Sequence, residues 1–271
     1  MVGFFARKLG ILLIVFGALP FAAQAQEPSA QEIVQNCDYK NPGTDQRSKL
    51  TITLIDKDGN ERKNVYLRLW KDYGGKEQVA DKMVLFTEYP PDARGSGFMR
   101  WAFTAEADKN ADQWIYLPVL RKTRRVAIRD PGDSFLGSDL TYADISGRSV
   151  DQDEHKILKT ETKDGAEQYV IESTPKESAP LYSKRVSWFT KGDWNSCHKT
   201  QVQYYDTKGL LLKKQSLTWQ QVGDAWLWKR VEVENVQTKH RSVFEVDDAE
   251  VNVGLDDEIF TERTLKTGYK R

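Results

Sequence analysis

The residues best suited to chemistry are one serine and three histidines. Ser134 follows Gly132 and Asp133, a pattern that some esterases use for their nucleophile. That chemistry also needs a base histidine, usually three residues after an aspartate, to take the hydroxyl proton. The histidines are His155, His198 and His240, and the residues three positions before them are Gln152, Asn195 and Gln237. A G-x-S-x-G elbow is also missing from the sequence. The sequence therefore predicts no enzymatic activity of this class.

Metal-ligating residue types are present, but their spacing does not suit an ion. Cys197 and His198 are adjacent, which on a strand places them on opposite faces. Asp151, Asp153 and Glu154 form an acidic turn without the glycine and distal glutamate of an EF-hand loop. Paired cysteines and an H-E-x-x-H sequence are both missing from the sequence. We expect no metal centre and no cofactor.

Cys37 and Cys197 are the two cysteines of the chain and lie 160 positions apart. In an oxidising compartment a disulfide between them would stabilise the fold by roughly 4–5 kcal/mol in the chain-entropy model. It would also pin the first helix to the sheet. Two buried free thiols are the alternative, and the spacing does not choose between the two.

The first 25 residues have the parts of an export signal. Arg7 and Lys8 precede a short apolar core, and Ala23-Gln24-Ala25 supplies a small-x-small cleavage pattern. The apolar run is short for a membrane span of roughly 20 residues. We therefore expect cleavage near Ala25, which leaves residues 26–271 as one periplasmic domain.

Composition excludes some partners and favours a β fold. The chain has 40 basic and 40 acidic residues, and loss of Arg7 and Lys8 leaves a net charge of −2. Such a balance gives no long-range attraction for nucleic acid. Hydrophobic residues make up 39% and aromatic residues 11% of the chain. Aromatic side chains favour strands.

Segments with alternating apolar and polar residues fill most of the chain. Asp58-Gly59, for example, separates residues 49–55 from residues 64–70, as in a hairpin. About ten or eleven strands result, mostly in sequential hairpins, and an antiparallel meander of that size must curl. The sequence therefore predicts a mainly β fold, in which a curved antiparallel sheet forms a half-barrel.

Two helices complete the expected fold. Residues 28–37 form the first, because Ser29 and Glu32 fit the S-x-x-E capping box. The second is a short helix in the middle of the chain, capped by Ser138 or Asp139. Its inward side chains would be Leu140, Ala143 and Ile145.

Aromatic residues on neighbouring strands are the main candidates for ligand binding. Trp101 and Phe103 share one face of their strand, and Trp114 and Tyr116 share one face of the next. Taken singly, most of them would be core packing. A curved sheet with little helix, however, leaves part of its concave face uncovered, as an apolar cavity. We expect one set of these four residues to line it.

Residues 130–147 are the lid candidate over this cavity, with glycines that would let the segment move. The lid adds three expected ligand-binding residues: Phe135, Leu136 and Tyr142.

A basic cluster follows the aromatic strands. On a regular strand Arg121 and Arg125 share one face, while Lys122 and Arg124 share the other. Because guanidinium groups suit phosphate oxygens, Arg121, Arg124 and Arg125 are candidates for a lipid head group at the cavity rim, or for an acidic patch on a membrane partner. The alternative is an edge strand that its charges keep from aggregating.

These stretches resemble the periplasmic outer-membrane lipoprotein-sorting proteins of the LolA/LolB-like superfamily, and more narrowly the branch associated with RND-type exporters. The residues that carry the resemblance are Arg94, Gly95, Gly97, Phe98, Trp114, Tyr116, Leu117, Pro118, Arg121, Arg124, Arg125, Ser134, Phe135, Leu136, Gly137, Ser138, Asp139, Tyr142, Asp144 and Ile145. Strand and turn order extend it more loosely over residues 30–265. The resemblance implies the same half-barrel fold.

The sequence thus predicts a non-enzymatic periplasmic carrier. Its passenger would be a lipid or an acylated lipoprotein, shielded in the cavity between membranes, with transient contact to a membrane surface. One acyl chain would contribute about 0.8 kcal/mol of binding free energy per buried CH₂. The alternative is a periplasmic adaptor or binding module of an inner-membrane RND-type exporter, with no lipid passenger.

Overall fold

The first helix begins where the capping box predicts it. The computed structural model describes residues 27–38, 40–107, 109–126, 132–146, 148–163, 165–178 and 180–269. In it, α1 spans Ala30–Cys37, and the Ser29 hydroxyl accepts a hydrogen bond from the Glu32 amide at 3.2 Å. The Glu32 carboxylate in turn accepts one from the Ser29 amide at 2.8 Å. The expected export signal, residues 1–25, lies outside the described residues.

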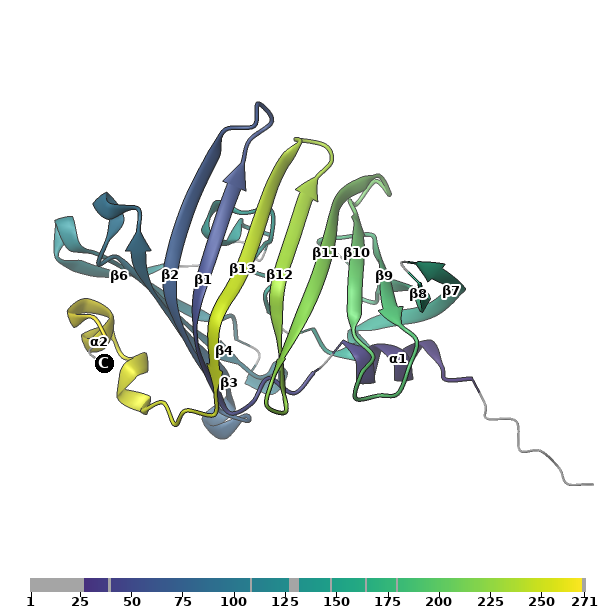
Figure 1. Cartoon of the computed structure of the whole chain (residues 1–271), viewed down its shortest axis with the longest axis horizontal. Helices are drawn as coiled ribbons and strands as arrows, with labels where there is room; N and C mark the ends of the chain where they lie inside the picture. Colours follow the sequence, from purple (N-terminus) through teal and green to yellow (C-terminus); the bar gives the residue numbers. More distant parts are fainter. Residues whose placement is uncertain are drawn as a thin grey trace, which may run out of the picture.

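Thirteen strands form one antiparallel sheet (Figure 1). They are β1 (Asp45–Ile55), β2 (Glu61–Asp72), β3 (Val79–Tyr89), β4 (Gly97–Phe103), β5 (Asp112–Leu117), β6 (Lys122–Val126), β7 (Asp153–Lys163), β8 (Ala166–Pro175), β9 (Lys184–Thr190), β10 (Lys199–Tyr205), β11 (Leu211–Val222), β12 (Ala225–Asn235) and β13 (His240–Val251). The mainly β fold and curved sheet are confirmed. The expected total of ten or eleven strands is too low, since thirteen segments pair in the sheet.

Two meanders build this sheet and meet in its middle. β1 to β6 run outward to one edge, β7 to β13 run inward from the other, and β1 pairs with β13. That central register extends from Gln46 opposite Val251 to Ile55 opposite Arg241. The chain therefore leaves β6 at one edge of the sheet and enters β7 at the opposite edge. Residues 132–146, which we call the crossing segment, lie between these edges on the inner, concave face.

The inner face carries the main hydrophobic core. Its buried side chains include Leu50, Ile52, Leu54, Met83, Leu85, Phe98, Val231, Val233, Phe244 and Val246. Phe135 and Leu140 of the crossing segment are buried against them. The Phe135 ring meets Phe98 and Tyr142 edge-on, with centroid separations of 5.8 and 5.7 Å. The crossing segment therefore covers the inner face, as expected of the lid candidate.

The capped helix expected in the crossing segment is not there. The segment contains a 3₁₀ turn at Phe135–Gly137 and further turns, with no α-helix in the part of it that the structure describes. The expected caps have other partners. The Ser138 hydroxyl donates to the Phe135 carbonyl at 2.7 Å, and the Asp139 carboxylate lies 2.6 Å from the Ser242 hydroxyl and 2.7 Å from His240 Nδ1. A contact within the turn for Ser138 and contacts to β13 for Asp139 thus replace helix capping.

A second core lies on the outer face of β2 to β5, beneath the C-terminal segment. The 3₁₀ turn Asp257–Phe260 and helix α2, Glu262–Thr267, bury Phe260 and Leu265 on this face. Gly97 permits the close approach, since a Cβ there would lie only 2.6 Å from Leu265 Cδ1. None of the helices in the described ranges is long and apolar enough to cross a membrane.

A disulfide ties α1 to the sheet. Cys37, the last residue of α1, is bonded to Cys197 with an S–S distance of 2.03 Å, so the bridged alternative is the one present. Both sulfurs lie in a third core cluster, where Ile33 packs with Ile171 and Phe189 on β8 and β9. The bridge therefore holds α1 against the half of the sheet near β7.

We expect the double substitution Cys37→Ala with Cys197→Ala to lower the free energy of unfolding by about 3–5 kcal/mol, because the bridge closes a loop of 160 residues. Urea unfolding measures this, with and without reductant. The double variant serves as the control, since reductant should not destabilise it further. An equal midpoint for oxidised and reduced protein would contradict the prediction.

Candidate ligand-binding site

Three adjacent cavities lie between the inner face and the crossing segment. Their volumes are about 340, 260 and 250 Å³. The first and second share Asp38, Ile145, Trp219 and Trp228 in their linings. The second and third share Ala143, Asp144, Ser146, Arg148 and Arg185. We call the first the tryptophan cavity and the second the charged cavity, after the side chains that surround them.

Indole rings make up much of the wall of the tryptophan cavity. The four are Trp70, Trp219, Trp226 and Trp228, and the apolar remainder includes Leu50, Met83, Phe135, Phe244 and Val246. Trp219 is held in place because its Nε1 donates to the Lys199 carbonyl at 2.7 Å. Trp226 stacks on the His198 ring at a centroid separation of 5.7 Å. Apolar walls with few polar groups are typical of sites for hydrophobic ligands.

A β-bulge in β12 turns its tryptophans toward this cavity. In the pairing of β11 with β12, Thr218 faces Arg230 but Trp219 faces Trp228, so Lys229 is the extra residue. Simple alternation from the buried Val231 would send Trp228 to the outer face. The bulge reverses that assignment, as bulges do when they redirect side chains.

One end of the tryptophan cavity is cationic. Arg68 on β2 and Arg100 on β4 line it together with a single neighbouring carboxylate, Asp81 on β3. Arg100 Nη1 lies 3.2 Å from Asp81 Oδ1, and its Nη2 donates to Ser146 Oγ of the crossing segment at 3.1 Å. Arg68 Nη1 instead donates to the neutral Gln46 side chain, at 2.6 Å. Burial lowers the pKa of Arg68 to about 10, so this guanidinium carries a desolvation penalty.

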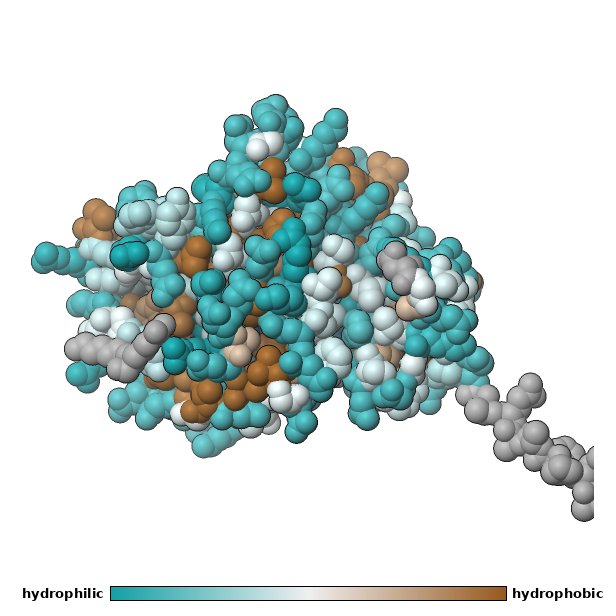
Figure 2. Space-filling view, viewed as in Figure 1, coloured by the Kyte–Doolittle hydropathy of each residue, from teal (hydrophilic) through white to brown (hydrophobic). Residues whose placement is uncertain are grey.

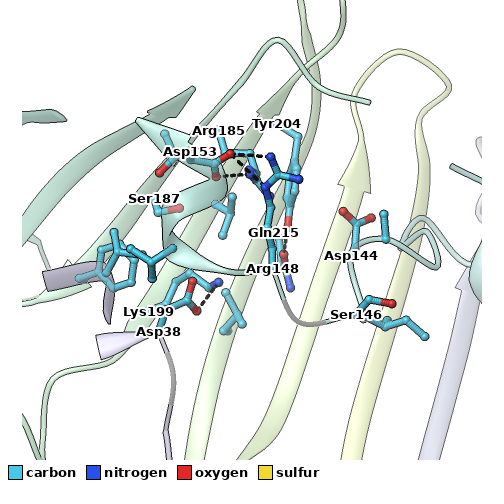
Figure 3. Close-up of a pocket in the computed structure, with 18 of the residues that line it drawn as sticks. Asp38, Asp144, Ser146, Arg148, Asp153, Arg185, Ser187, Lys199, Tyr204 and Gln215 are labelled. Atoms are coloured by element: carbon cyan, nitrogen blue, oxygen red, sulfur yellow. Dashed lines mark hydrogen bonds and ion pairs between the residues drawn. The ribbon is translucent and has the colours of Figure 1, made fainter. Parts of the chain in front are cut away.

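The charged cavity is built from ion pairs that neutralise one another. Figure 3 shows Asp153 paired with both Arg148 and Arg185. Lys199 Nζ lies 2.5 Å from Asp38 Oδ1, and the same view shows the two side chains facing each other. Because each carboxylate has a cation beside it, this cavity presents little net charge to a ligand.

The histidines and Ser134 occupy structural positions. His155 contacts Ser173 Oγ at 2.8 Å as its cross-strand partner and the Val150 carbonyl at 2.9 Å. His240 contacts Asp139, and the Ser134 hydroxyl donates to the Ser138 carbonyl. The structure thus places Ser134 in a turn. Among the residues that the structure describes, no group of three or more His, Cys, Asp or Glu side chains is arranged to hold a metal ion.

A buried ion pair fastens the crossing segment to the sheet. Asp144 Oδ2 lies 2.5 Å from Lys213 Nζ of β11, and both side chains are 3% exposed. The Tyr182 hydroxyl also donates to Asp144, at 3.1 Å, and Lys213 Nζ donates to the Asp139 carbonyl at 2.9 Å. We call Asp144, Lys213 and Tyr182 the Asp144 clamp. Burial lowers the pKa of Lys213, while the Asp144 carboxylate opposes that shift.

The aromatic residues of β4 and β5 do not line the cavities. Trp101, Trp114 and Tyr116 belong to the outer core beneath the C-terminal segment, where Trp101 Nε1 donates to the Phe260 carbonyl at 3.1 Å. Phe103 lies under Lys109, with Nζ 3.9 Å from the ring centroid. The expectation that one set of the four faces the concave side therefore needs correction. Their neighbours in the alternation, such as Phe98 and Ile115, face inward instead.

The aromatic residues of the crossing segment do lie on the inner face. Phe135 lines the tryptophan cavity, Tyr142 lines the third cavity, and Leu136 packs against the inner core. Their roles in ligand binding remain predictions. The tryptophans of β11 and β12 were not among the expected site residues. A signal for them was available, since Trp226 and Trp228 alternate out of phase with the valines that follow.

The basic cluster lies at the edge of the sheet. Arg124 and Arg125 belong to β6, the edge strand, while Arg121 precedes it in the left-handed conformation (φ 48°). Arg125 pairs with Asp112. Arg124 faces Ile115 in the register and so lies on the inner side. All three arginines are exposed, and none is among the residues that line the cavities, which favours the edge-strand interpretation.

Comparisons with known proteins agree with this architecture. A protein-family model described as "-like: Uncharacterized protein" matches residues 79–267. Among solved structures, one described as an outer membrane lipoprotein-sorting protein domain, from Vibrio parahaemolyticus, has a TM-score of 0.72 at 25% identity and covers 88% of this chain and 96% of that one. A LolA superfamily protein from Nitrosomonas europaea has a TM-score of 0.62 at 19% identity, covering 87% and 99%. The chain belongs to the family that this model describes, and it shares the fold of the LolA superfamily protein.

A third solved structure shares the fold of this chain. A DUF1329 family protein from Desulfovibrio piger has a TM-score of 0.74 at 24% identity and covers 87% of this chain and 95% of that one. A search of curated proteins gave no match. The narrower branch associated with RND-type exporters stays a prediction.

Removal of the Asp144 carboxylate from the Asp144 clamp should destabilise the folded protein. Asp144→Asn leaves Lys213 charged and buried without a counter-ion, which costs about 3–5 kcal/mol of unfolding free energy. The double variant Asp144→Asn with Lys213→Met should recover much of that loss, because it removes the unpaired charge. Urea unfolding of both variants checks the coupling. A double variant no more stable than Asp144→Asn would contradict it.

Proposed function

We propose that this protein is a periplasmic carrier that holds an apolar chain in the tryptophan cavity while the crossing segment covers it. The observation that carries the proposal is the cavity itself, about 340 Å³ of space walled by four tryptophans on the inner face. A sheet that needed only a closed core would fill this space with side chains, since protein interiors are close-packed. The crossing segment, held by the Asp144 clamp, is the natural cover.

The size of the cavity points to a slender passenger. Its volume is near the lower end for small-molecule sites, which run from about 300 to 1,000 Å³. We infer that it takes one acyl chain, from a lipid or from an acylated lipoprotein. At about 0.8 kcal/mol per buried CH₂, such a chain supplies useful affinity with few polar contacts. The solved structure described as a lipoprotein-sorting domain supports this assignment.

Exposed apolar side chains support transient contact with a membrane. The turn between β5 and β6 contains Val119, 91% exposed, and Leu120, 47% exposed, and Leu117 just before it is 39% exposed. A hydrophobic group stands out over this turn at the left end of the molecule in Figure 2. The basic residues of β6 follow directly. Apolar groups beside cations suit the surface of an anionic bilayer.

Binding can be followed through the tryptophans of the cavity. We expect dibromostearate to quench up to about half of the tryptophan emission of lipid-free protein, because four of the eight tryptophans line the cavity. Trp219→Phe with Trp228→Phe should shrink the quenched fraction. Trp114→Phe is the matched control, since Trp114 lies in the outer core.

Absence of quenching in folded, lipid-free protein would refute the carrier proposal. That result would favour the alternative function, an adaptor or binding module of an RND-type exporter without a lipid passenger. Native mass spectrometry of gently purified protein provides an independent check, because a carrier should retain co-purified lipid.

The membrane contact has its own test. Val119→Asp with Leu120→Asp should reduce co-sedimentation with vesicles of phosphatidylglycerol several-fold, because it removes the exposed apolar tip and repels the anionic surface. Leu210→Asp, at another exposed leucine (61% exposed), is the control and should have little effect. Equal sedimentation of all three proteins would argue against this surface.

A further inference from the structure

Arg68 and Lys40 are the two charged side chains in the wall of the tryptophan cavity that have no salt bridge among the described residues. The other charged groups are accounted for. Asp38 pairs with Lys199, and Arg100 pairs with Asp81. The Lys40 ammonium donates to the carbonyls of Trp194 and Asn195, at 2.7 and 3.2 Å. Arg68 has a single hydrogen bond, to the neutral amide oxygen of Gln46.

The surroundings of Arg68 make this arrangement costly. In the register it faces Ser48 on β1 and Leu85 on β3, in the middle of the inner face. The Ser48 hydroxyl is itself buried without a hydrogen-bond partner in the described part of the chain. A guanidinium has five N–H donors, and Arg68 loses hydration while only the attraction of Asp81, which already pairs with Arg100, opposes that cost. The part of Arg68 that remains accessible faces the cavity.

The cavity therefore has a polarity along its length. Arg68 and Arg100 give the β2–β4 end two positive charges against the single carboxylate of Asp81. At the other end, Trp219 and Trp228 on β11 and β12 offer indole faces. From β2 to β11 the sheet order counts four strand intervals, or roughly 19 Å at about 4.8 Å each. A molecule with one anionic end and one apolar end matches this distribution.

We propose that Arg68 binds the anionic head group of the passenger, and that the passenger is a single-chain amphiphile whose carboxylate or phosphate lies between β1 and β4. This inference rests on the proposed carrier function and specifies its ligand. The head group lies inside the molecule, beside Arg68, and the acyl chain extends toward the tryptophans of β11 and β12. Arg100 adds positive potential while it stays bound to Asp81 and Ser146.

Affinities for matched charged and neutral probes test the assignment. Dibromostearate and dibromostearyl alcohol share their chain and differ in the head group. Unmodified protein should bind the acid roughly 10- to 100-fold more tightly, as expected for a charge-assisted hydrogen bond in a buried site. Arg68→Met should remove that difference and leave affinity for the alcohol unchanged. Arg68→Lys should restore part of it.

Two controls separate this role from a structural one. Arg241→Met removes an exposed arginine that pairs with Glu232 on the outer side of β12 and β13, and it should not change either affinity. Thermal melting of Arg68→Met should show no loss of stability, because the substitution replaces a desolvated charge that has no salt bridge by an apolar side chain. The comparison of acid with alcohol in unmodified protein stands even if a variant misfolds.

Competition distinguishes a lipid head group from a free anion. Hexadecyl phosphate should displace dibromostearate, whereas inorganic phosphate at the same concentration should not. Displacement by inorganic phosphate would overturn the assignment to an amphiphile. Equal binding of acid and alcohol by unmodified protein would overturn the role of Arg68 and leave the carrier proposal intact. Binding of neither probe would refute the carrier proposal, and this inference with it.

Discussion

The pairing of the first strand with the last is the constraint on which the rest of this structure depends. Once β1 and β13 pair in the middle of the sheet, the two free edges are β6 and β7, which are consecutive in the chain. The chain between them has to pass from edge to edge, and the crossing segment does so over the inner face. The covered cavity is therefore a product of topology, before any particular side chain is considered. A simple meander would have left the same face open to solvent.

Two cations of the inner face, Lys213 and Arg68, have opposite energetics. Lys213 has the carboxylate of Asp144 beside it, so its burial fastens the crossing segment. Among the described residues, Arg68 has one hydrogen bond, to an amide oxygen, and shares the Asp81 carboxylate with Arg100. Because its pKa is lowered to about 10, folding disfavours its charged form. The penalty is fully present below about pH 10 and declines as the pH rises from there toward the ordinary pKa of arginine. Residues that reduce the stability of the fold in this way are common at ligand-binding sites.

Much of the fold could be predicted from local sequence signals, and the site could not. The capping box of Ser29 and Glu32 placed α1 correctly, and alternation placed the strands, because both signals depend on neighbours in the chain. Alternation also grouped Trp101 with Phe103, and Trp114 with Tyr116. It says which residues share a face, but not which face is covered. Which face is covered depends on residues far away in the sequence, such as Leu265, which packs on Gly97 of the outer face.

The site tryptophans escaped prediction for a related reason. The bulge at Lys229 shifts the alternation of β12 by one residue, so a pattern that holds at Val231 fails at Trp228. The path of the crossing segment was likewise invisible, since it follows from the pairing of β1 with β13. Its turns are stabilised by contacts with residues more than 60 positions away, such as Lys213 and Ser242. Such contacts leave no local pattern.

The division of the cavity between sheet and crossing segment also has an evolutionary consequence. The floor of the cavity is the sheet, whose strands are joined by a continuous ladder of backbone hydrogen bonds. A backbone shift caused by a substitution in one strand therefore also displaces the neighbouring strands. Its ceiling is a stretch of 15 residues, 132–146, which contacts the sheet through side chains and a few turns. Substitutions in the ceiling change the shape of the space while the scaffold keeps its register. Relatives with this topology can therefore diverge in what they hold through changes in one short segment of sequence.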